Sequence, residues 1–233
     1  MKNPVIAIVQ ARMGSSRLPN KMMLNLKGIP VVEWVRRRVS MAKQIDNLVF
    51  AIPDTQSDQE LAEYLFRIGT KVYRGSETDV LERMTEAART ESAKTVIRIC
   101  ADNPLICGSE IDRLIDFYRC GAYDYAYNHI PRGNTYPDGL GAEIVSMDLL
   151  ELLNRKALLS DHREHAFNYI WDHLDQFRIG TCNPLDDAME HPELKLDLDT
   201  TADYDALLKL NIWPEMSAHD VVTTALQFLP NIK

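Results

Sequence analysis

Short apolar runs alternate with segments of helical periodicity through the first half of the chain. The runs predicted as strands are 5–9, 47–52, 71–73 and 95–100, and the segments predicted as helices are 30–41, 57–68, 77–89 and 109–120. Continuous apolar runs are typical of strands that helices cover on both faces, as in a parallel sheet. The alternation therefore predicts an α/β fold with a mainly parallel sheet flanked by helices.

The pattern changes in the second half. Strands are predicted at 123–128, 142–146, 177–181 and 194–198, and helices at 147–159, 161–173, 202–210 and 219–228. A link rich in Pro, Gly and Asn joins the first two of these strands, which predicts a smaller mixed β extension over about 122–146. Because no repeat or linker interrupts the chain, we expect one domain over 1–233.

The bulk composition limits the partners. A formal net charge of -8 argues against nucleic acid or an anionic membrane as the main partner. No apolar run approaches the ~20 residues of a membrane helix, and the first apolar run is too short for a signal peptide. We therefore expect a cytoplasmic protein. Its cysteines (Cys100, Cys107, Cys120 and Cys182) show no CxxC spacing, so neither zinc nor a disulfide frame is indicated.

The segment QARMGSSRLPNK at 10–21 is basic although the chain is acidic, and residues 1–32 hold no Asp or Glu. Small residues allow backbone N–H groups to approach an anion closely, and cations neutralise it. The small residues are Gly14, Ser15 and Ser16, and the cations are Arg12, Arg17 and Lys21. This composition predicts a site for several phosphates. The alternative is a solvated basic loop.

Aspartates follow two predicted strands. Asp102 comes two residues after 95–100. Asp197 lies in the run 194–198 and Asp199 follows it, and the two-residue spacing places both on one face if the segment is a strand. Ligands of open parallel sheets bind beyond the carboxyl ends of the strands. A carboxylate there can face a phosphate through Mg²⁺, which takes one or two carboxylates plus phosphate oxygens. Alternatively, Asp199 caps the following helix and Asp102 is a turn residue.

Six segments occur in an order that resembles a known family. They are QARMGSSRLPNK, YRGSETDVLER, ADNPLI, YPDGLGAE, REH and LDLDTTADY. The chain resembles cytidylyltransferases of the acylneuraminate group over residues 6 to about 205, most of all the spore coat polysaccharide biosynthesis protein F branch. CMP-Kdo and CMP-sialic acid synthetases are more distantly similar. The resemblance implies a Rossmann-like, GT-A-type nucleotidyltransferase fold that uses CTP and Mg²⁺.

The resemblance also implies roles for individual residues. Arg12, Lys21, Asp102 and Asp199 are the expected catalytic residues, and the two aspartates hold the magnesium. The expected nucleotide-binding residues are Gln10, Ala11, Arg12, Gly14, Ser15, Ser16, Arg17, Lys21, Arg74, Gly75, Ser76, Asp79 and Arg83. The expected acceptor-binding residues are Tyr136, Pro137, Asp138, Gly139, Glu143, Glu164 and His165. Exposure of Arg83 and a structural role for His165 are the alternatives.

Two departures from the family pattern concern the last motif. The usual T-P-E-D is replaced by residues 200–203, TTAD, and Asp197 occupies a position where many members of this branch have no acid. Asp197 either shares the metal ion or replaces Asp199.

The resemblance implies Mg²⁺-dependent transfer of CMP from CTP to an acidic sugar or similar small anionic acceptor. Pyrophosphate is released, and the pathway leads to a surface polysaccharide. We also expect a homodimer, with acceptor-side or dimer contacts on the β extension. The alternatives are a glycosyltransferase using Asp197-x-Asp199, a cytidylyltransferase acting on a phosphorylated or phosphonate acceptor, and a CTP-binding subunit without turnover.

Overall fold

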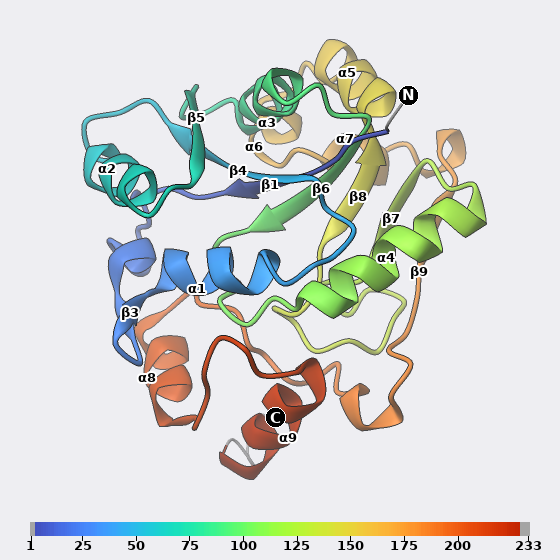
Figure 1. The fold of residues 1–233 in the computed structure, drawn as a ribbon. Helices are drawn as coiled ribbons and strands as arrows, with labels where there is room; N and C mark the ends of the chain where they lie inside the picture. Colours follow the sequence, from blue (N-terminus) through green and yellow to red (C-terminus); the bar gives the residue numbers. More distant parts are fainter. Residues whose placement is uncertain (1–2, 229–233) are drawn as a thin grey trace.

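The computed structural model describes residues 3–228, and their strands form a seven-stranded sheet in the order β5-β4-β1-β6-β8-β7-β9 (Figure 1). The strands are β1 (Val5–Gln10), β4 (Asn47–Pro53), β5 (Lys71–Gly75), β6 (Thr95–Cys100), β7 (Tyr125–Tyr127), β8 (Glu143–Ser146) and β9 (Ile179–Thr181). The first four in this order are parallel, β8 pairs antiparallel with β6, and β7 pairs antiparallel with β8. The predicted parallel sheet with a mixed β extension is confirmed.

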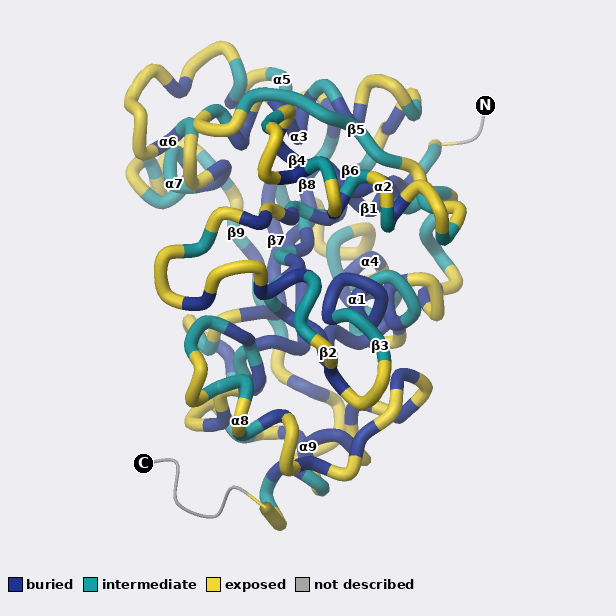
Figure 2. The backbone as a smooth tube through the Cα atoms, turned by 90° about the vertical axis from the view of Figure 1, so that its left-hand side faces the viewer, coloured by how far each residue is buried: buried dark blue, intermediate teal, exposed yellow. Residues whose placement is uncertain are grey.

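Helices cover both faces of this sheet (Figure 1). On one side lie α1 (Val31–Val39), α2 (Gln59–Arg67) and α4 (Gly108–Gly121), with α8 (Thr201–Lys209) and α9 (Ala218–Phe228) farther from the sheet (Figure 1). On the other side lie α3 (Val80–Thr90), α5 (Met147–Lys156) and α7 (Asn168–Trp171), and α6 (Ser160–Glu164) packs against α3. The side chains of β1 alternate between the two cores: Ala7 and Val9 enter one, and Ile6 and Ile8 enter the other. Both faces of the sheet are therefore apolar and need a cover of helices. The central strands are accordingly buried in Figure 2.

The predicted helix over 161–173 is wrong, because α6 and α7 are separate. The helical pattern is interrupted where Phe167 is buried against Tyr125, at 5.2 Å between ring centroids. The backbone leaves the helical conformation at His165, where φ is -108° and ψ is 84°. Tertiary packing of this kind overrides local helical preference. Short 3₁₀ turns also occur at Lys21–Met23, Leu174–Gln176 and Asp187–Met189.

The predicted strand over 194–198 is also wrong. Its leucines alternate with polar residues and are buried, as they would be in a strand. However, the backbone pairs with loops: Leu196 N–H donates to Asp138 O at 3.0 Å, and Leu198 N–H donates to Asp102 O at 2.7 Å. The segment is therefore an extended stretch with one isolated bridge, between Asp138 and Lys195.

A small hairpin that the sequence did not suggest follows the basic loop. Strands β2 (Asn25–Leu26) and β3 (Ile29–Pro30) pair antiparallel around a two-residue turn, Lys27–Gly28. Both turn residues have positive φ, 51° and 92°, as a type I′ turn requires. Lys27 is not a typical residue for that conformation, which is why the turn was missed.

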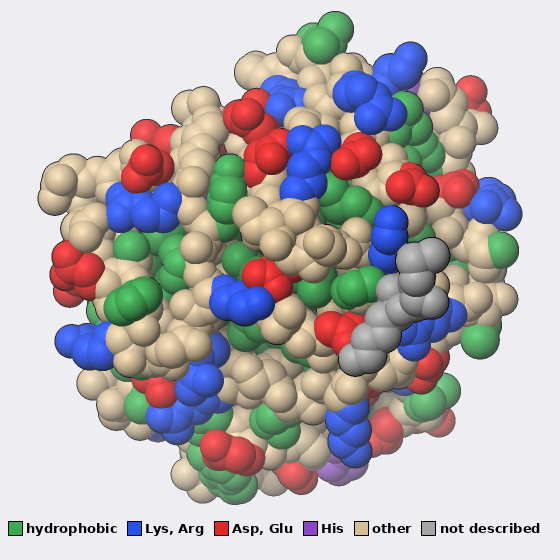
Figure 3. Space-filling view, turned by 45° about the horizontal axis from the view of Figure 1, so that its top comes forward, with side chains coloured by type: hydrophobic (Ala, Val, Ile, Leu, Met, Phe, Trp, Pro, Cys, Tyr) green, Lys and Arg blue, Asp and Glu red, His purple; other side chains and the backbone are tan. Residues whose placement is uncertain are grey.

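The surface shows no segregation of charge on the face drawn in Figure 3, where Lys and Arg side chains are interspersed with Asp and Glu. Within residues 3–228, no helix combines the length and the apolar character needed to cross a membrane.

Candidate active site

Hydrogen bonds and buried side chains anchor the basic loop after β1 to the core. Met13 N–H donates to the buried carboxylate of Asp58 at 2.7 Å, and the side chains of Met13 and Leu18 are buried in the core. Ser15 Oγ accepts a hydrogen bond from Leu18 N–H at 3.2 Å. These anchors leave the residues between them on the surface, at the carboxyl end of β1. The loop therefore presents its small residues and cations at the edge where ligands of parallel sheets bind.

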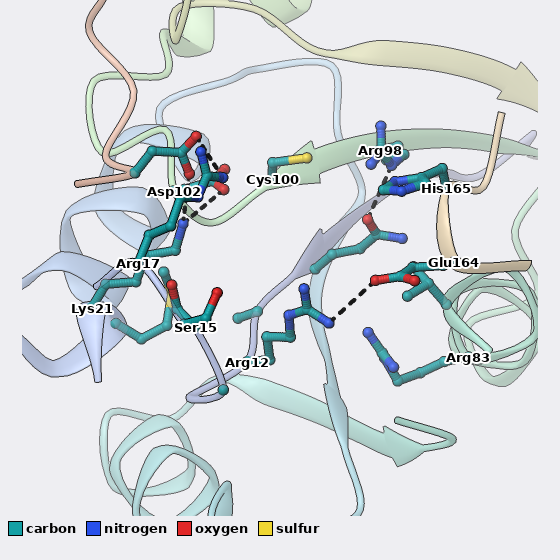
Figure 4. A pocket seen from close by; sticks show the side chains of 17 residues that line it. Arg12, Ser15, Arg17, Lys21, Arg83, Arg98, Cys100, Asp102, Glu164 and His165 are labelled. Atoms are coloured by element: carbon teal, nitrogen blue, oxygen red, sulfur yellow. Dashed lines mark hydrogen bonds and ion pairs between the residues drawn. The ribbon is translucent and has the colours of Figure 1, made fainter. Parts of the chain in front are cut away.

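Lys21 joins three distant parts of the chain (Figure 4). Its Nζ lies 3.0 Å from Asp102 Oδ2, 3.2 Å from Asp199 Oδ1 and 3.0 Å from Leu198 O. Arg17 approaches the other oxygen of Asp199 at 2.9 Å. The ammonium group has three donors, and all three find acceptors here. The two aspartates predicted to share a cation thus share the ammonium of Lys21.

The carboxylate of Asp199 is not used to cap α8. The N-cap is Thr200, whose side chain accepts from Asp203 N–H, and the Asp203 carboxylate accepts in return from Thr200 N–H. This is a capping box with Asp in the third helical position. The alternative that Asp199 serves as the cap is therefore wrong, and its carboxylate faces the basic loop.

Asp197 lies apart from this cluster. Its carboxylate is 3.5 Å from Lys195 Nζ, with a side chain 13% exposed. Burial, and then the nearby carboxylate of Asp138, raise the pKa of Asp197 to about 6. Gly139 allows this packing, since a Cβ there would lie 2.8 Å from the Asp197 backbone nitrogen. Because the segment is not a strand, Asp197 and Asp199 do not share a strand face. The role of Asp197 at the metal ion stays a prediction.

A cavity of about 320 Å³ opens over the loop and the two aspartates. Thirteen of the residues expected at the site line it: Gln10, Ala11, Arg12, Gly14, Ser15, Ser16, Arg17, Lys21, Arg83, Asp102, Glu164, His165 and Asp199. Arg12 extends across it toward Glu164 on α6, at 3.8 Å (Figure 4). Five cations and three carboxylates therefore face one concave space once Arg98, described below, is included.

Arg83 is 2% exposed, so the alternative that it is an exposed helical arginine is wrong. Its Nε donates to Ala51 O at 3.3 Å, and its guanidinium also binds the carbonyls of Ser76 and Glu77. Burial, and then the nearby charge of Arg12, lower the pKa of Arg83. Arg83 thus fixes the turn that precedes α3 while its side chain lines the cavity.

Ten of the expected site residues do not line this cavity: Arg74, Gly75, Ser76, Asp79, Tyr136, Pro137, Asp138, Gly139, Glu143 and Asp197. Arg74 pairs with Asp54 at 2.9 Å. Asp79 caps α3 and binds Arg163 of α6 at 2.6 Å. Tyr136 is fully buried between Glu110 and Arg113. These side chains shape the structure around the site.

Sequence reasoning missed Arg98, in the middle of β6. Its Nε donates to Gln10 Oε1 at 3.0 Å, and its guanidinium pairs with Glu143 on β8. The available signal was a lone arginine inside the apolar run TVIRIC. Cys100 lines the cavity two residues later; burial raises its pKa to about 12, so its thiol stays protonated at neutral pH.

A second cavity, of about 530 Å³, adjoins the first. Arg98 and His165 line both. Its walls include four aromatic side chains, those of Tyr125, Tyr127, Phe167 and Trp171, together with the expected acceptor residue Glu143. Burial alone would raise the pKa of Glu143, but Arg98 and His129 outweigh this effect and hold it well below its usual range.

Comparison with known proteins agrees with this geometry. The chain is 30% identical to the spore coat polysaccharide biosynthesis protein SpsF of Bacillus subtilis over 230 residues, covering 95% of this chain and 93% of SpsF. The structure matches a cytidylyltransferase from Leptospira borgpetersenii with a TM-score of 0.88, at 27% identity over 98% of this chain and 95% of that one.

A more distant solved structure shares the fold. CMP:2-keto-3-deoxy-manno-octonic acid synthetase, complexed with CTP, matches with a TM-score of 0.62 at 16% identity, covering 88% of this chain and 97% of its own. The expected Rossmann-like nucleotidyltransferase fold is thereby confirmed. The model of the cytidylyltransferase family matches residues 6–228. The chain therefore belongs to the cytidylyltransferase family, and it is a nucleotidyltransferase.

Proposed function

We propose that this enzyme transfers CMP from CTP to a small acidic sugar or a similar anionic acceptor, with release of pyrophosphate, in the synthesis of a surface polysaccharide. The observation that carries the proposal is the meeting of Lys21, Asp102 and Asp199 beneath a basic loop. Family membership, the resemblance to SpsF and the fold shared with a CTP-bound synthetase support it.

The donor set fits Mg²⁺. Within residues 3–228, no group of three or more His, Cys, Asp and Glu side chains could hold a metal ion, so the chain offers the carboxylates of Asp102 and Asp199 and no complete cage. Mg²⁺ takes one or two carboxylates and completes its shell with phosphate oxygens and water. Bound there, it would neutralise charge on the phosphates. It would also compete with Lys21 for the same carboxylate oxygens.

The chain's own residues position the reactants. Arg12, Arg17 and Lys21 bind the triphosphate, and the backbone of Gly14 to Ser16 lies against it. The acceptor oxygen forms a bond to the α-phosphorus, the bond from that phosphorus to the pyrophosphate oxygen breaks, and the acceptor's proton leaves to solvent. Such transfers depend mainly on positioning and on stabilising charge.

The separation of Asp197 from the cavity weakens the glycosyltransferase alternative, because that alternative needs Asp197 and Asp199 to act as one metal-binding pair. A CTP-binding subunit without turnover would not need metal-binding carboxylates. Asp102 and Asp199 are both present, so this alternative gains no support.

Pyrophosphate release, measured with each of the four nucleotides and a panel of acidic acceptors, tests the proposal. We expect CTP to be used well ahead of ATP, GTP and UTP. Chelator should abolish turnover and Mg²⁺ should restore it. Asp102→Asn and Asp199→Asn should each lower kcat by about a hundredfold or more, since removal of a group that stabilises developing charge has effects of this size.

Asp205→Asn is the matched control, because this aspartate is exposed on α8 and lies outside both cavities. It should retain wild-type turnover. Equal use of UTP and CTP, or wild-type turnover in both Asp102→Asn and Asp199→Asn, would overturn the proposal.

A further inference from the structure

We propose that the aromatic-walled second cavity holds the acceptor, and that Arg132 binds the acceptor's acidic group while Trp171 and Tyr127 face its ring. This inference rests on the proposed function and adds the residues that select the acceptor. None of these three residues was expected at the site from the sequence.

Aromatic rings in mutual contact form part of the wall of the cavity. The Tyr125 ring packs on Tyr127 at 5.6 Å and edge-on to Trp171 at 5.8 Å, and Tyr127 meets Trp171 at 5.5 Å. Aromatic faces suit the C–H face of a sugar ring, and they lose little conformational entropy when a ligand binds. The volume of about 530 Å³ accommodates a molecule of monosaccharide size.

The charge of the cavity indicates an anion. Glu143 is its carboxylate, and it is already neutralised by Arg98, with His129 at 3.4 Å and Tyr125 as further partners. Arg132 instead lies over the Trp171 ring, 4.2 Å from its centroid, and among residues 3–228 its guanidinium has no carboxylate partner. A cationic ligand would be repelled by the guanidinium of Arg132. An acidic ligand would find an uncompensated forked donor.

The position of the cavity is right for the reaction. Arg98 and His165 line both cavities, so a molecule in the second adjoins a nucleotide in the first. Arg98 also joins Gln10 beside the basic loop to Glu143 in the acceptor wall. We regard Arg98 as a positioning residue that fixes Gln10 in the first cavity relative to Glu143 in the second.

Two independent measurements test this. Fluorescence of Trp171 is titrated with glucuronate, 2-keto-3-deoxy-manno-octonic acid, neutral glucose and cationic glucosamine. The Trp171→Phe variant identifies the part of the signal that comes from Trp171. Pyrophosphate release then gives KM for CTP and for the acidic acceptor in wild type, Arg132→Gln and Arg132→Lys. Arg67→Gln is the matched control, because Arg67 also stacks on an aromatic ring, Tyr64, but outside both cavities.

We expect at least one acid, and neither glucose nor glucosamine, to quench Trp171. Arg132→Gln should raise KM for the acceptor by about tenfold or more, as expected for loss of a charge-assisted contact, and leave KM for CTP unchanged. Arg132→Lys should recover part of this loss, and Arg67→Gln should match wild type.

The proposal is overturned if no acid perturbs Trp171, if glucosamine binds as well as the acids, or if Arg132→Gln retains the wild-type KM for the acceptor. Failure of the proposed function gives a different result: CTP does not bind in calorimetry, although an acid still quenches Trp171.

Discussion

Lys21 is buried, whereas Arg12 is about half exposed, and the two cations of the basic loop therefore behave differently. Lys21 neutralises two carboxylates from segments far apart in the sequence. Removing it leaves Asp102 without this buried cation and Asp199 with the exposed Arg17. Arg12 makes one long ion pair, to Glu164 at 3.8 Å. Exposed pairs of this kind contribute little to stability.

We predict that Arg12→Ala and Lys21→Ala each lower kcat/KM for CTP by about tenfold or more, because each loses a charge-assisted phosphate contact. Thermal unfolding should distinguish them. Arg12→Ala should keep the wild-type Tm, whereas Lys21→Ala should unfold at lower temperature.

Lys27→Ala is the control for both variants. It removes a cation from the same N-terminal segment, but Lys27 donates to Leu208 O at an exposed position outside both cavities. Wild-type kinetics in both Arg12→Ala and Lys21→Ala would contradict the assignment of the loop to phosphate binding.

At the scale of elements, Arg163 fastens α6 to its neighbours. Its guanidinium donates to Asp79, the N-cap of α3, at 2.6 Å, and to Asn154 O of α5 at 2.7 Å. The next two residues, Glu164 and His165, line the active-site cavity. The hydrogen bonds of Arg163 to α3 and α5 thus help to fix the position of Glu164 and His165.

We predict that Arg163→Met destabilises the enzyme by about 1–3 kcal/mol, since it leaves the Asp79 carboxylate without its charged partner. Urea denaturation measures this. Arg163→Lys should recover only part of the loss, because an ammonium cannot reproduce the fork.

Arg178→Met provides the comparison. It also removes an Arg–Asp pair, to Asp124, but at a site where the arginine side chain is 67% exposed. That change should stay within about 0.5 kcal/mol of wild type. Equal destabilisation by Arg163→Met and Arg178→Met would show that the α3–α6 link has no special role.

Element types were predictable wherever local pattern and tertiary packing agreed. The apolar runs of β1, β4 and β6 could be recognised as strands because each is buried on both faces. The segment 194–198 misled because alternating burial produces the same pattern whether the backbone pairs with a strand or with loops. The break between α6 and α7 occurs beside the contact of Phe167 with Tyr125, a tertiary contact that no local pattern encodes.

The candidate site was predictable in its loop and carboxylates, because their residue types are unusual for their positions. The walls of the second cavity were not, since Tyr127 and Trp171 look like ordinary core residues in the sequence. Tyr127 lies on β7 and Trp171 in α7, and only the packing of α7 beside β7 brings the two rings to one cavity. The expected homodimer stays a prediction.

At the scale of the whole molecule, Asp197 makes stability depend on pH. Its pKa is raised to about 6 in the folded state, above its ordinary value of 3.8, chiefly by burial and then by Asp138. Between these values the folded protein keeps a proton that the unfolded chain has released. Stability from this group therefore falls as pH rises from about 4 to about 6 and stays lower above that range.

We predict that Asp197→Asn, which cannot ionise, is more stable than wild type at pH 7. Its free energy of unfolding should be higher by about 1–3 kcal/mol, and its Tm should be higher accordingly. The difference should shrink at pH 4, where the carboxyl is protonated in the folded state. Calorimetric Tm values at both pH values, with the exposed Asp205→Asn for comparison, measure it. A variant less stable than wild type at pH 7 would contradict the prediction.

The sheet changes from parallel to antiparallel pairing between β6 and β8, and the two cavities lie on different sides of this change. The basic loop, which we propose binds the phosphates, follows a parallel strand, and the walls of the second cavity come from β7, β8 and the α6–α7 region. Exchange of those later segments between relatives should therefore alter which acceptor is chosen without altering which nucleotide is chosen. If the two cavities hold the nucleotide and the acceptor as proposed, the preferences for them can evolve separately, and we expect such exchanges to succeed only where Arg98, which lines both cavities, is kept.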